Sequence, residues 1–266
     1  RIRNICNNMK SILITGGTGL IGSKLLDSID KSVYNVYVLT RKKSYKENGV
    51  NYINWDPENS VLDISQIKNL YSIINLAGES IDGSRWTSNY KRKILDSRVN
   101  STRLLFNKVK EMKELPKSFI SASATGFYEV NTDNPQAETD LPGNNFLSDV
   151  VQQWEKEILK FKSLGLRTTT FRIGLVLSKD GGVLKRLYPI FKFFLGVPIG
   201  SGKQMISWIH ESDMIGLINM AIESNKLEGI YNAVAPEIIT NTEFTKSLLK
   251  SLNRFSYPSI IKAPSF

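Results

Sequence analysis

The chain is poor in the side chains that form disulfides and most often bind zinc. It has one cysteine, Cys6, and one histidine, His210, among 266 residues. A single cysteine excludes an internal disulfide and fits a reducing compartment. A single histidine without neighbouring cysteines leaves too few ligands for a zinc site, so we expect no metal.

Long apolar runs and nucleic-acid-reading motifs are scarce as well. No apolar stretch approaches the roughly 20 residues that span a bilayer, and the basic residues 1–8 lack the apolar core of a signal peptide. We expect a cytoplasmic protein in which residues 1–8 are an extension before the natural start at Met9. A transit remnant, and thus an organelle, is the alternative. The formal charge of +10 is dispersed and no reading motif accompanies it, so we expect neither a nucleic-acid nor a membrane partner.

The stretch Ser11–Gly22, SILITGGTGLIG, joins an apolar strand pattern to a glycine-rich turn and a helical pattern. In a dinucleotide site the first glycine permits the tight turn, the second lets the backbone approach a pyrophosphate, and the third lets helix and strand pack closely. The helix N-terminus presents free amides to the anion. A nucleoside-triphosphate P-loop fails because Ser23 stands where that motif needs lysine. The predicted cofactor-binding residues here are Gly16, Gly17, Thr18, Gly19, Leu20, Ile21 and Gly22.

The end of the second predicted strand, 36–40, lacks the carboxylate that would bind the adenine-ribose 2′-OH of NAD. No Asp or Glu stands between Asp30 and Glu47, and the strand is followed by Arg41 and two lysines. Arginine at this place accommodates a 2′-phosphate. The pattern predicts NADP(H), contacted by Thr40 and Arg41. A solvated cluster in a lysine-rich loop is the alternative.

Strand and helix patterns alternate along the chain as far as Leu177. Strands are predicted at 50–55, 73–76, 119–125 and 168–177, helices at 90–113 and 146–163, and a long loop at 126–145. This alternation predicts an α/β fold with a doubly wound parallel sheet of Rossmann type. Leu76, Ala77 and Gly78 follow a buried strand, where small residues let the backbone approach a cofactor. Asp56 either contacts the adenine edge or starts the turn before Pro57.

The regular alternation of strand and helix patterns ends after Leu177. A glycine pair precedes an apolar helix, and a strand is predicted at 207–210. Asp213 is predicted to cap a helix. A strand and turn are predicted at 229–236, and the last helix at 242–252. We expect residues 9–177 to form a cofactor-binding domain. Residues 178–266 are expected to form a smaller C-terminal α/β substrate lobe, interleaved with the main domain, over the carboxyl edge of the sheet.

Motifs in a fixed order carry a resemblance to a known superfamily. GGTGLIG, NLAGESI, RWT, DSRV, SASATGFY, RIGLVLSKDGG, GSGKQ, SWIHESD and NAVAPE occur from Met9 to the end of the chain. Together they resemble the extended short-chain dehydrogenases/reductases and, more closely, the YfcH type of their NAD(P)-dependent epimerase/dehydratase family. The resemblance implies a Rossmann fold and an NAD(P) cofactor. It also implies further helices beyond Phe266, so we expect a chain cut short.

The resemblance also implies that the usual proton relay is missing. The superfamily places a tyrosine and a lysine four residues apart on the helix after the long loop. Phe146 and Val150 stand at those places, while Ser123 stands at the place of the superfamily's serine. Neither phenylalanine nor valine transfers protons. Ser123 and Tyr128 are the remaining catalytic candidates, with a strand-end hydrogen bond and aromatic packing as their alternative roles.

Two cations are candidates for binding an anionic substrate. Arg85 follows the predicted strand 73–76, and Arg98 stands where many relatives have asparagine. The alternative for Arg98 is a helix-surface ion pair with Asp96 or Glu111. His210 and Asp213 resemble the superfamily's H-x-x-D element and are expected to anchor the lobe.

Two functions of different class fit these residues. The first is an NADP(H)-dependent oxidoreductase or epimerase-like enzyme acting on a small polar carbonyl or hydroxyl compound, sugar-derived compounds included. The second is a non-catalytic NADP(H)-binding sensor or regulatory protein, which the inert Phe146 and Val150 favour. Substrate, direction of reaction and oligomeric state do not follow from the sequence.

Overall fold

The computed structural model describes residues 9–129, 134–193, 195–255 and 263. Its strands and helices, with two short 3-10 helices, follow one another in this order: β1 (Lys10–Thr15), α2 (Leu20–Ser28), β2 (Tyr34–Thr40), β3 (Tyr45–Glu47), β4 (Val50–Asp56), β5 (Val61–Leu62), β6 (Leu70–Asn75), α3 (Ser88–Lys110), β7 (Ser118–Ala124), η1 (Thr125–Phe127), α4 (Phe146–Leu159), η2 (Lys160–Leu164), β8 (Arg167–Ile173), β9 (Leu175–Leu177), α5 (Gly182–Lys192), β10 (Met205–Ile206), β11 (Trp208–His210), α6 (Glu211–Glu223), β12 (Gly229–Ala233), β13 (Ile239–Thr240) and α7 (Asn241–Ser251).

The main sheet is parallel except at one edge. Its strands lie in the order β12-β8-β7-β6-β1-β2-β4-β3, and β5 pairs with β4. Among the described strands of this sheet, β3 and β5 run antiparallel to their neighbour and the others run parallel. The chain starts in the middle with β1, moves outward through β2 and β4, and then returns to β6 on the other side of β1. This reversal confirms the predicted doubly wound sheet, and it places the switch point at the carboxyl ends of β1 and β6.

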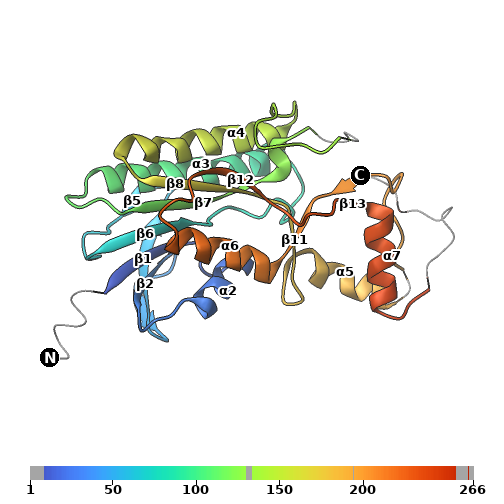
Figure 1. Ribbon diagram of the computed structural model, residues 1–266, viewed down its shortest axis with the longest axis horizontal. Helices are drawn as coiled ribbons and strands as arrows, with labels where there is room; N and C mark the ends of the chain where they lie inside the picture. The colour runs from blue at the N-terminus through green and yellow to red at the C-terminus, as the bar shows by residue number, and fades with distance from the viewer. Residues whose placement is uncertain (1–8, 130–133, 194, 256–262, 264–266) are drawn as a thin grey trace.

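Helices cover both faces of the sheet (Figure 1). Helices α3 and α4 lie on one face, and α2 and α6 on the other. Successive side chains of β1 point to opposite faces of the sheet, and both faces are apolar. Ile12 and Ile14 belong to the core on the α2 and α6 side, whereas Leu13 belongs to the core under α3 and α4. All three side chains are fully buried, as expected for a strand covered on both faces.

The C-terminal part of the chain adds two small sheets beyond the carboxyl edge. β9 pairs with β11 in parallel, and β10 pairs with β13 in antiparallel fashion. Helices α5 and α7 lie at this end of the molecule (Figure 1), whereas β12 returns to the main sheet beside β8. The smaller C-terminal α/β lobe predicted from the sequence is therefore present.

Two local predictions were wrong. The predicted strand 168–177 is interrupted at Gly174, whose N–H donates to the carbonyl of Ala233 at 3.1 Å. A Cβ atom at this position would lie 2.7 Å from the carbonyl oxygen of Ser207, so the chain passes too close to that backbone to continue in one sheet. Helix α6 is capped by His210, whose Nδ1 accepts from the N–H of Ser212 at 3.2 Å. Asp213 lies in the first turn instead.

Candidate functional site

The glycine turn, residues 15–22, is packed so tightly that neither Gly16 nor Gly22 has room for a side chain. Gly16 has φ +67°, and a Cβ atom there would lie 2.6 Å from the carbonyl oxygen of Leu76. A Cβ atom on Gly22 would lie 2.2 Å from the carbonyl oxygen of Gly16. Helix α2 begins after Gly19, which offers no side-chain cap. The first-turn amides therefore receive no hydrogen bond from a capping side chain, and in dinucleotide-binding folds amides at this place bind the diphosphate.

Thr15 joins this turn to the end of β6. Its hydroxyl accepts from the N–H groups of Leu76 and Ala77, both at 3.0 Å, and donates to the side-chain oxygen of Asn75 at 2.9 Å. Asn75 in turn donates to the hydroxyls of Thr102 and Ser121, each at 3.1 Å. Sequence reasoning missed Thr15 and Asn75. Their signal was a polar residue at the end of each of two buried strands.

The segment after β2 is held through its backbone, which leaves its cations free to face solvent. The side chain of Asn54 donates to the carbonyl of Lys42 at 2.8 Å, and the Thr40 hydroxyl accepts from the N–H of Lys42 at 3.2 Å. The side chains of Arg41, Lys42 and Lys43 are exposed. The structure thus places Arg41 and Thr40 at the same edge of the sheet as the glycine turn.

Asp56 starts a turn, which was one of its two predicted roles. Its carboxylate accepts from the side chain of Asn59 at 2.7 Å and from the N–H groups of Asn59 and Glu58 at 3.2 and 3.0 Å. These hydrogen bonds, with that of the Asn59 side chain foremost, hold the pKa of Asp56 below its ordinary value.

Ser123 and Tyr128 lie in a buried ion-pair cluster. Glu155 and Arg172 form a bidentate pair with both distances at 2.9 Å. The Ser123 hydroxyl donates to Glu155 at 2.6 Å, and the Tyr128 hydroxyl accepts from Arg172 at 3.0 Å and donates to Asn232 at 2.6 Å. Ser123 and Tyr128 are only 4% and 6% exposed. The structure brings the two candidates together through Glu155 and Arg172.

The same cluster fixes the described part of the loop before α4. Arg172 donates to the carbonyl of Glu138 at 3.2 Å, and the side chain of Asn232 donates to the carbonyl of Gln136 at 3.2 Å. The Glu138 carboxylate accepts from the N–H of Asn232 at 2.7 Å. This loop is therefore tied to β8 and β12. Residues 130–133 of the predicted loop lie outside the described residues.

Arg98 lies on the face of α3 that is turned toward the end of β6. Its guanidinium stands 3.1 Å from where a Cβ atom of Gly78 would be and 5.5 Å from the ring of Trp154. It donates to the carbonyl of Ile94 at 3.0 Å. Burial lowers the pKa of Arg98, and Glu79 opposes that effect. Glu111, one of its predicted partners, pairs with Lys108 at 3.0 Å.

The places of the superfamily's tyrosine and lysine are apolar. Val150 is 3% exposed, and Phe146 packs edge-on against Trp86 with the ring centroids 5.5 Å apart. Trp86 and Arg85 belong to the loop 76–87, which leaves β6 at the carboxyl edge, and Arg85 is exposed. The aromatic Trp86 was not singled out from the sequence, although it directly follows Arg85.

The segment before α5 lies over the start of α2. Asp180 forms an ion pair with Lys24 of α2, and Arg186 of α5 forms one with Asp82 of the loop 76–87. A Cβ atom on Gly181 would lie 2.7 Å from the side chain of Leu20. The C-terminal lobe is therefore attached on both sides of the switch point, at the glycine turn and at the loop after β6.

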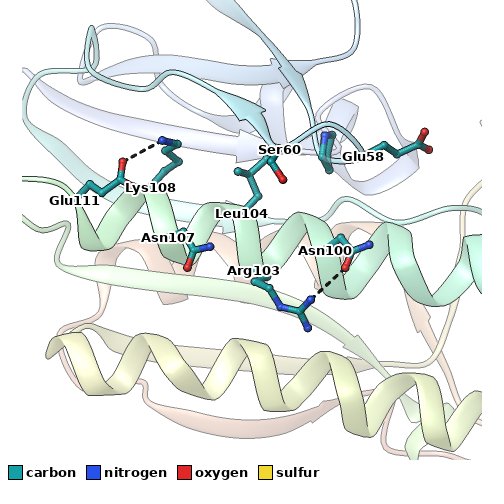
Figure 2. Close-up of a pocket in the computed structure, with 9 residues that line it drawn as sticks. Glu58, Ser60, Asn100, Arg103, Leu104, Asn107, Lys108 and Glu111 are labelled. Atoms are coloured by element: carbon teal, nitrogen blue, oxygen red, sulfur yellow. Dashed lines mark hydrogen bonds and ion pairs between the residues drawn. The ribbon is translucent and has the colours of Figure 1, made fainter.

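Two cavities lie elsewhere. One, of about 430 Å³, is lined by the turn after β4 and by α3, where Arg103 reaches Asn100 and Lys108 reaches Glu111 (Figure 2). The other, of about 1160 Å³, lies between the segment 62–71 and residues 108–117. Neither is lined by the glycine turn.

In the described part of the chain, no helix has the length and apolarity that a membrane span requires. Nor do three histidine, cysteine, aspartate or glutamate side chains gather there as metal ligands.

Comparisons with known proteins agree with this geometry. The model of the NAD dependent epimerase/dehydratase family matches residues 12–233. An epimerase family protein of Staphylococcus saprophyticus is 37% identical over 249 residues, which cover 92% of this chain and 82% of the relative. An epimerase family protein of Staphylococcus aureus is 36% identical over 249 residues, which cover 92% of this chain and 82% of that relative.

Solved structures give the same result. The human epimerase family protein SDR39U1 with NADPH has a TM-score of 0.81 and 29% identity, covering 96% of this chain and 82% of that one. A nucleoside-diphosphate sugar epimerase from Corynebacterium glutamicum has a TM-score of 0.76 and 29% identity, covering 96% and 54%. The protein is thus an NAD(P)-binding chain of the short-chain dehydrogenase type, and it belongs to the NAD dependent epimerase/dehydratase family.

Proposed function

We propose that this protein binds NADP(H) at the carboxyl edge of the sheet and uses it as an oxidoreductase or epimerase-like enzyme. The substrate is a small carbonyl or hydroxyl compound. The observation that carries the proposal is the glycine turn, in which Gly16 and Gly22 leave no room for a Cβ atom beside uncapped helix amides. A dinucleotide diphosphate needs this close backbone approach.

Different segments of the chain would bind different parts of the cofactor. The amides of Leu20 and Ile21 in the first turn of α2 would hold the diphosphate, while the Gly19 N–H closes the turn by donating to the carbonyl of Gly16 at 3.0 Å. The backbone of Leu76 to Gly78, fixed by Thr15, would lie along the nicotinamide half of the cofactor. Arg41 would pair with the 2′-phosphate, which is why we infer NADP(H) over NAD(H). The human relative named above, described with NADPH, supports this choice. When bound, the nicotinamide exchanges a hydride with the substrate.

The roles of Ser123 and Tyr128 in catalysis stay predictions. Both hydroxyls are buried and already bonded to Glu155, Arg172 and Asn232, which favours a positioning role for them. Arg98, beside Gly78, and the exposed Arg85 are proposed to attract an anionic substrate to this edge. Residues 178–266 are proposed to supply the rest of the substrate site.

One observation favours a second function, that of a non-catalytic NADP(H)-binding protein. Phe146 and Val150 occupy the places of the superfamily's proton relay, and neither side chain carries a group that transfers protons. In this case the bound cofactor would set conformation or partner binding.

Single-turnover experiments separate the two functions. The purified chain is loaded with NADPH and mixed with a panel of carbonyl compounds while NADPH fluorescence is followed. The enzyme predicts loss of fluorescence with at least one compound, at a rate that saturates with its concentration. Tight NADPH binding without loss of fluorescence for any compound would contradict the enzymatic function and favour the non-catalytic one.

A further inference from the structure

Trp86 is a large aromatic side chain that is held rigidly and still faces solvent. It is 43% exposed, and its indole N–H donates to the carbonyl of Ile81 at 2.6 Å. The loop that carries it is fixed at both ends, because Glu79 N–H donates to Ser97 at 2.9 Å and Thr87 caps α3 by accepting from Tyr90. Because the ring and its loop are already fixed, little conformational entropy is lost when a ligand covers the ring.

The surroundings of Trp86 are apolar on one side and cationic on another. Its ring meets Phe146 at an interplanar angle of 70°, in the T-shaped arrangement that aromatic pairs prefer. The ammonium of Lys91 lies 5.1 Å from the centroid of Phe146 and 5.9 Å from that of Trp86. Arg85 is exposed next to Trp86. A flat ligand with a negative charge would find both an aromatic face and cations here.

This surface lies where a substrate would meet the cofactor. Loop 76–87 leaves β6 beside the glycine turn, and Phe146 begins α4 at the place of the superfamily's tyrosine. The position that normally donates a proton to the substrate oxygen is thus covered by two aromatic rings.

We propose that Trp86 and Phe146 bind a planar, conjugated carbonyl compound with an anionic group, namely a quinone, with Lys91 facing its charge. The proposal rests on the proposed NADP(H)-dependent function and narrows its substrate class.

The chemistry of such a substrate explains the missing proton relay. Hydride addition to a simple carbonyl yields an alkoxide, which is about as basic as hydroxide. Hydride addition to a quinone yields a phenolate-type anion, with a conjugate-acid pKa near that of tyrosine, about 10. The second anion is much less basic than the alkoxide, so a nearby ammonium can stabilise it without donating a proton.

The reaction balances with NADPH as the reductant. A hydride, one hydrogen nucleus with two electrons, adds to the conjugated system, and a π-electron pair moves onto the carbonyl oxygen. NADPH is oxidised to NADP⁺ and the quinone is reduced. Loss of the proton from the carbon that received the hydride makes the ring aromatic, and water protonates both oxygens, so the hydroquinone forms with a net uptake of one proton.

A binding experiment tests the surface without any turnover. Naphthalene sulfonate, a flat anion that cannot accept a hydride, is titrated calorimetrically into the full chain with NADP⁺ present. Trp86→Leu is expected to weaken binding at least tenfold, as for loss of a stacked aromatic face, and Lys91→Met several-fold. Tyr71→Leu is the matched control: Tyr71 has Lys10 at 3.9 Å over its ring, but it lies on β6 near the strand's amino end. Equal affinities of the wild type and Trp86→Leu would overturn the proposal.

A turnover experiment separates this proposal from the general one. NADPH oxidation is measured with a naphthoquinone sulfonate and with the saturated ketone oxocyclohexane carboxylate, after subtraction of the protein-free rate. We expect the quinone to react at least a hundredfold faster, and Trp86→Leu to raise KM with little change in kcat. Faster reaction of the saturated ketone would overturn this proposal while the proposed function stands. Failure of NADPH to bind at all would overturn both.

Discussion

Replacing Gly22 by alanine is the sharpest perturbation of the cofactor site. Gly22 lies in the first turn of α2, and a Cβ atom there would sit 2.2 Å from the carbonyl oxygen of Gly16 and 2.6 Å from the Cα of Gly17. Ordinary Cβ contacts are 3.4–4 Å. Both neighbours are backbone atoms, so the turn itself must open by more than an ångström.

The size of the effect follows from what the turn does. Helix propensity alone would make Gly→Ala stabilising by about 0.5–1 kcal/mol, but forced overlap in a packed site costs about 1–3 kcal/mol. Opening the turn also moves amides that would hold the diphosphate. Each hydrogen bond to a charged group is worth about 1.5–3 kcal/mol, so losing one weakens NADPH binding by at least about tenfold.

Calorimetric titration with NADPH measures this loss, and Gly216→Ala is the matched control. Gly216 also lies in a helix, α6, and a Cβ atom there meets no other atom within 4 Å. Gly216→Ala should leave NADPH affinity unchanged and raise the free energy of unfolding slightly. If Gly22→Ala binds NADPH within twofold of the wild type, the glycine turn is not the phosphate site.

Two further predictions concern stability. Glu155→Gln leaves Arg172 buried without its counter-charge, so chemical denaturation should show that the free energy of unfolding falls by about 3–5 kcal/mol. The control Glu228→Gln, at an exposed pair, should lower it by less than about 1 kcal/mol. Equal losses in the two variants would contradict the account. The second is a pH effect. Although burial acts to raise it, hydrogen bonds from Lys160 and Arg103 hold the pKa of Glu157 below its ordinary 4.5. The resulting stability is present above that ordinary value and is lost as the pH falls through the lower folded pKa. The difference in unfolding free energy between wild type and Glu157→Gln should therefore shrink between about pH 6 and about pH 3; a constant difference would refute the assignment.

The elements that the sequence predicted well are those set by local pattern. The strand β1, the glycine turn and helix α2 form one continuous motif, in which apolar residues, glycines and a helical stripe follow each other directly. The turn at Asp56 also depends on residues only two and three positions away. Local signals of this kind do not require knowledge of which distant segments meet.

The features that were missed depend on distant partners. The break at Gly174 exists because β9 leaves β8 to pair with β11, more than 30 residues further along the chain. The Glu155–Arg172 pair, which holds both Ser123 and Tyr128, joins a helix to a strand through side chains with no characteristic spacing. Each polar residue there is ordinary by itself, and only the fold brings them together.

The central claim is that this edge of the sheet binds NADP(H) and that Arg41 selects it. Calorimetric titration of the wild type and of Arg41→Ala with NADPH and with NADH tests it most directly. The account predicts that NADPH binds the wild type at least tenfold more tightly than NADH, and that Arg41→Ala removes most of this preference because one charge-assisted pair is lost. Tighter binding of NADH, or no heat with either coenzyme, would contradict it.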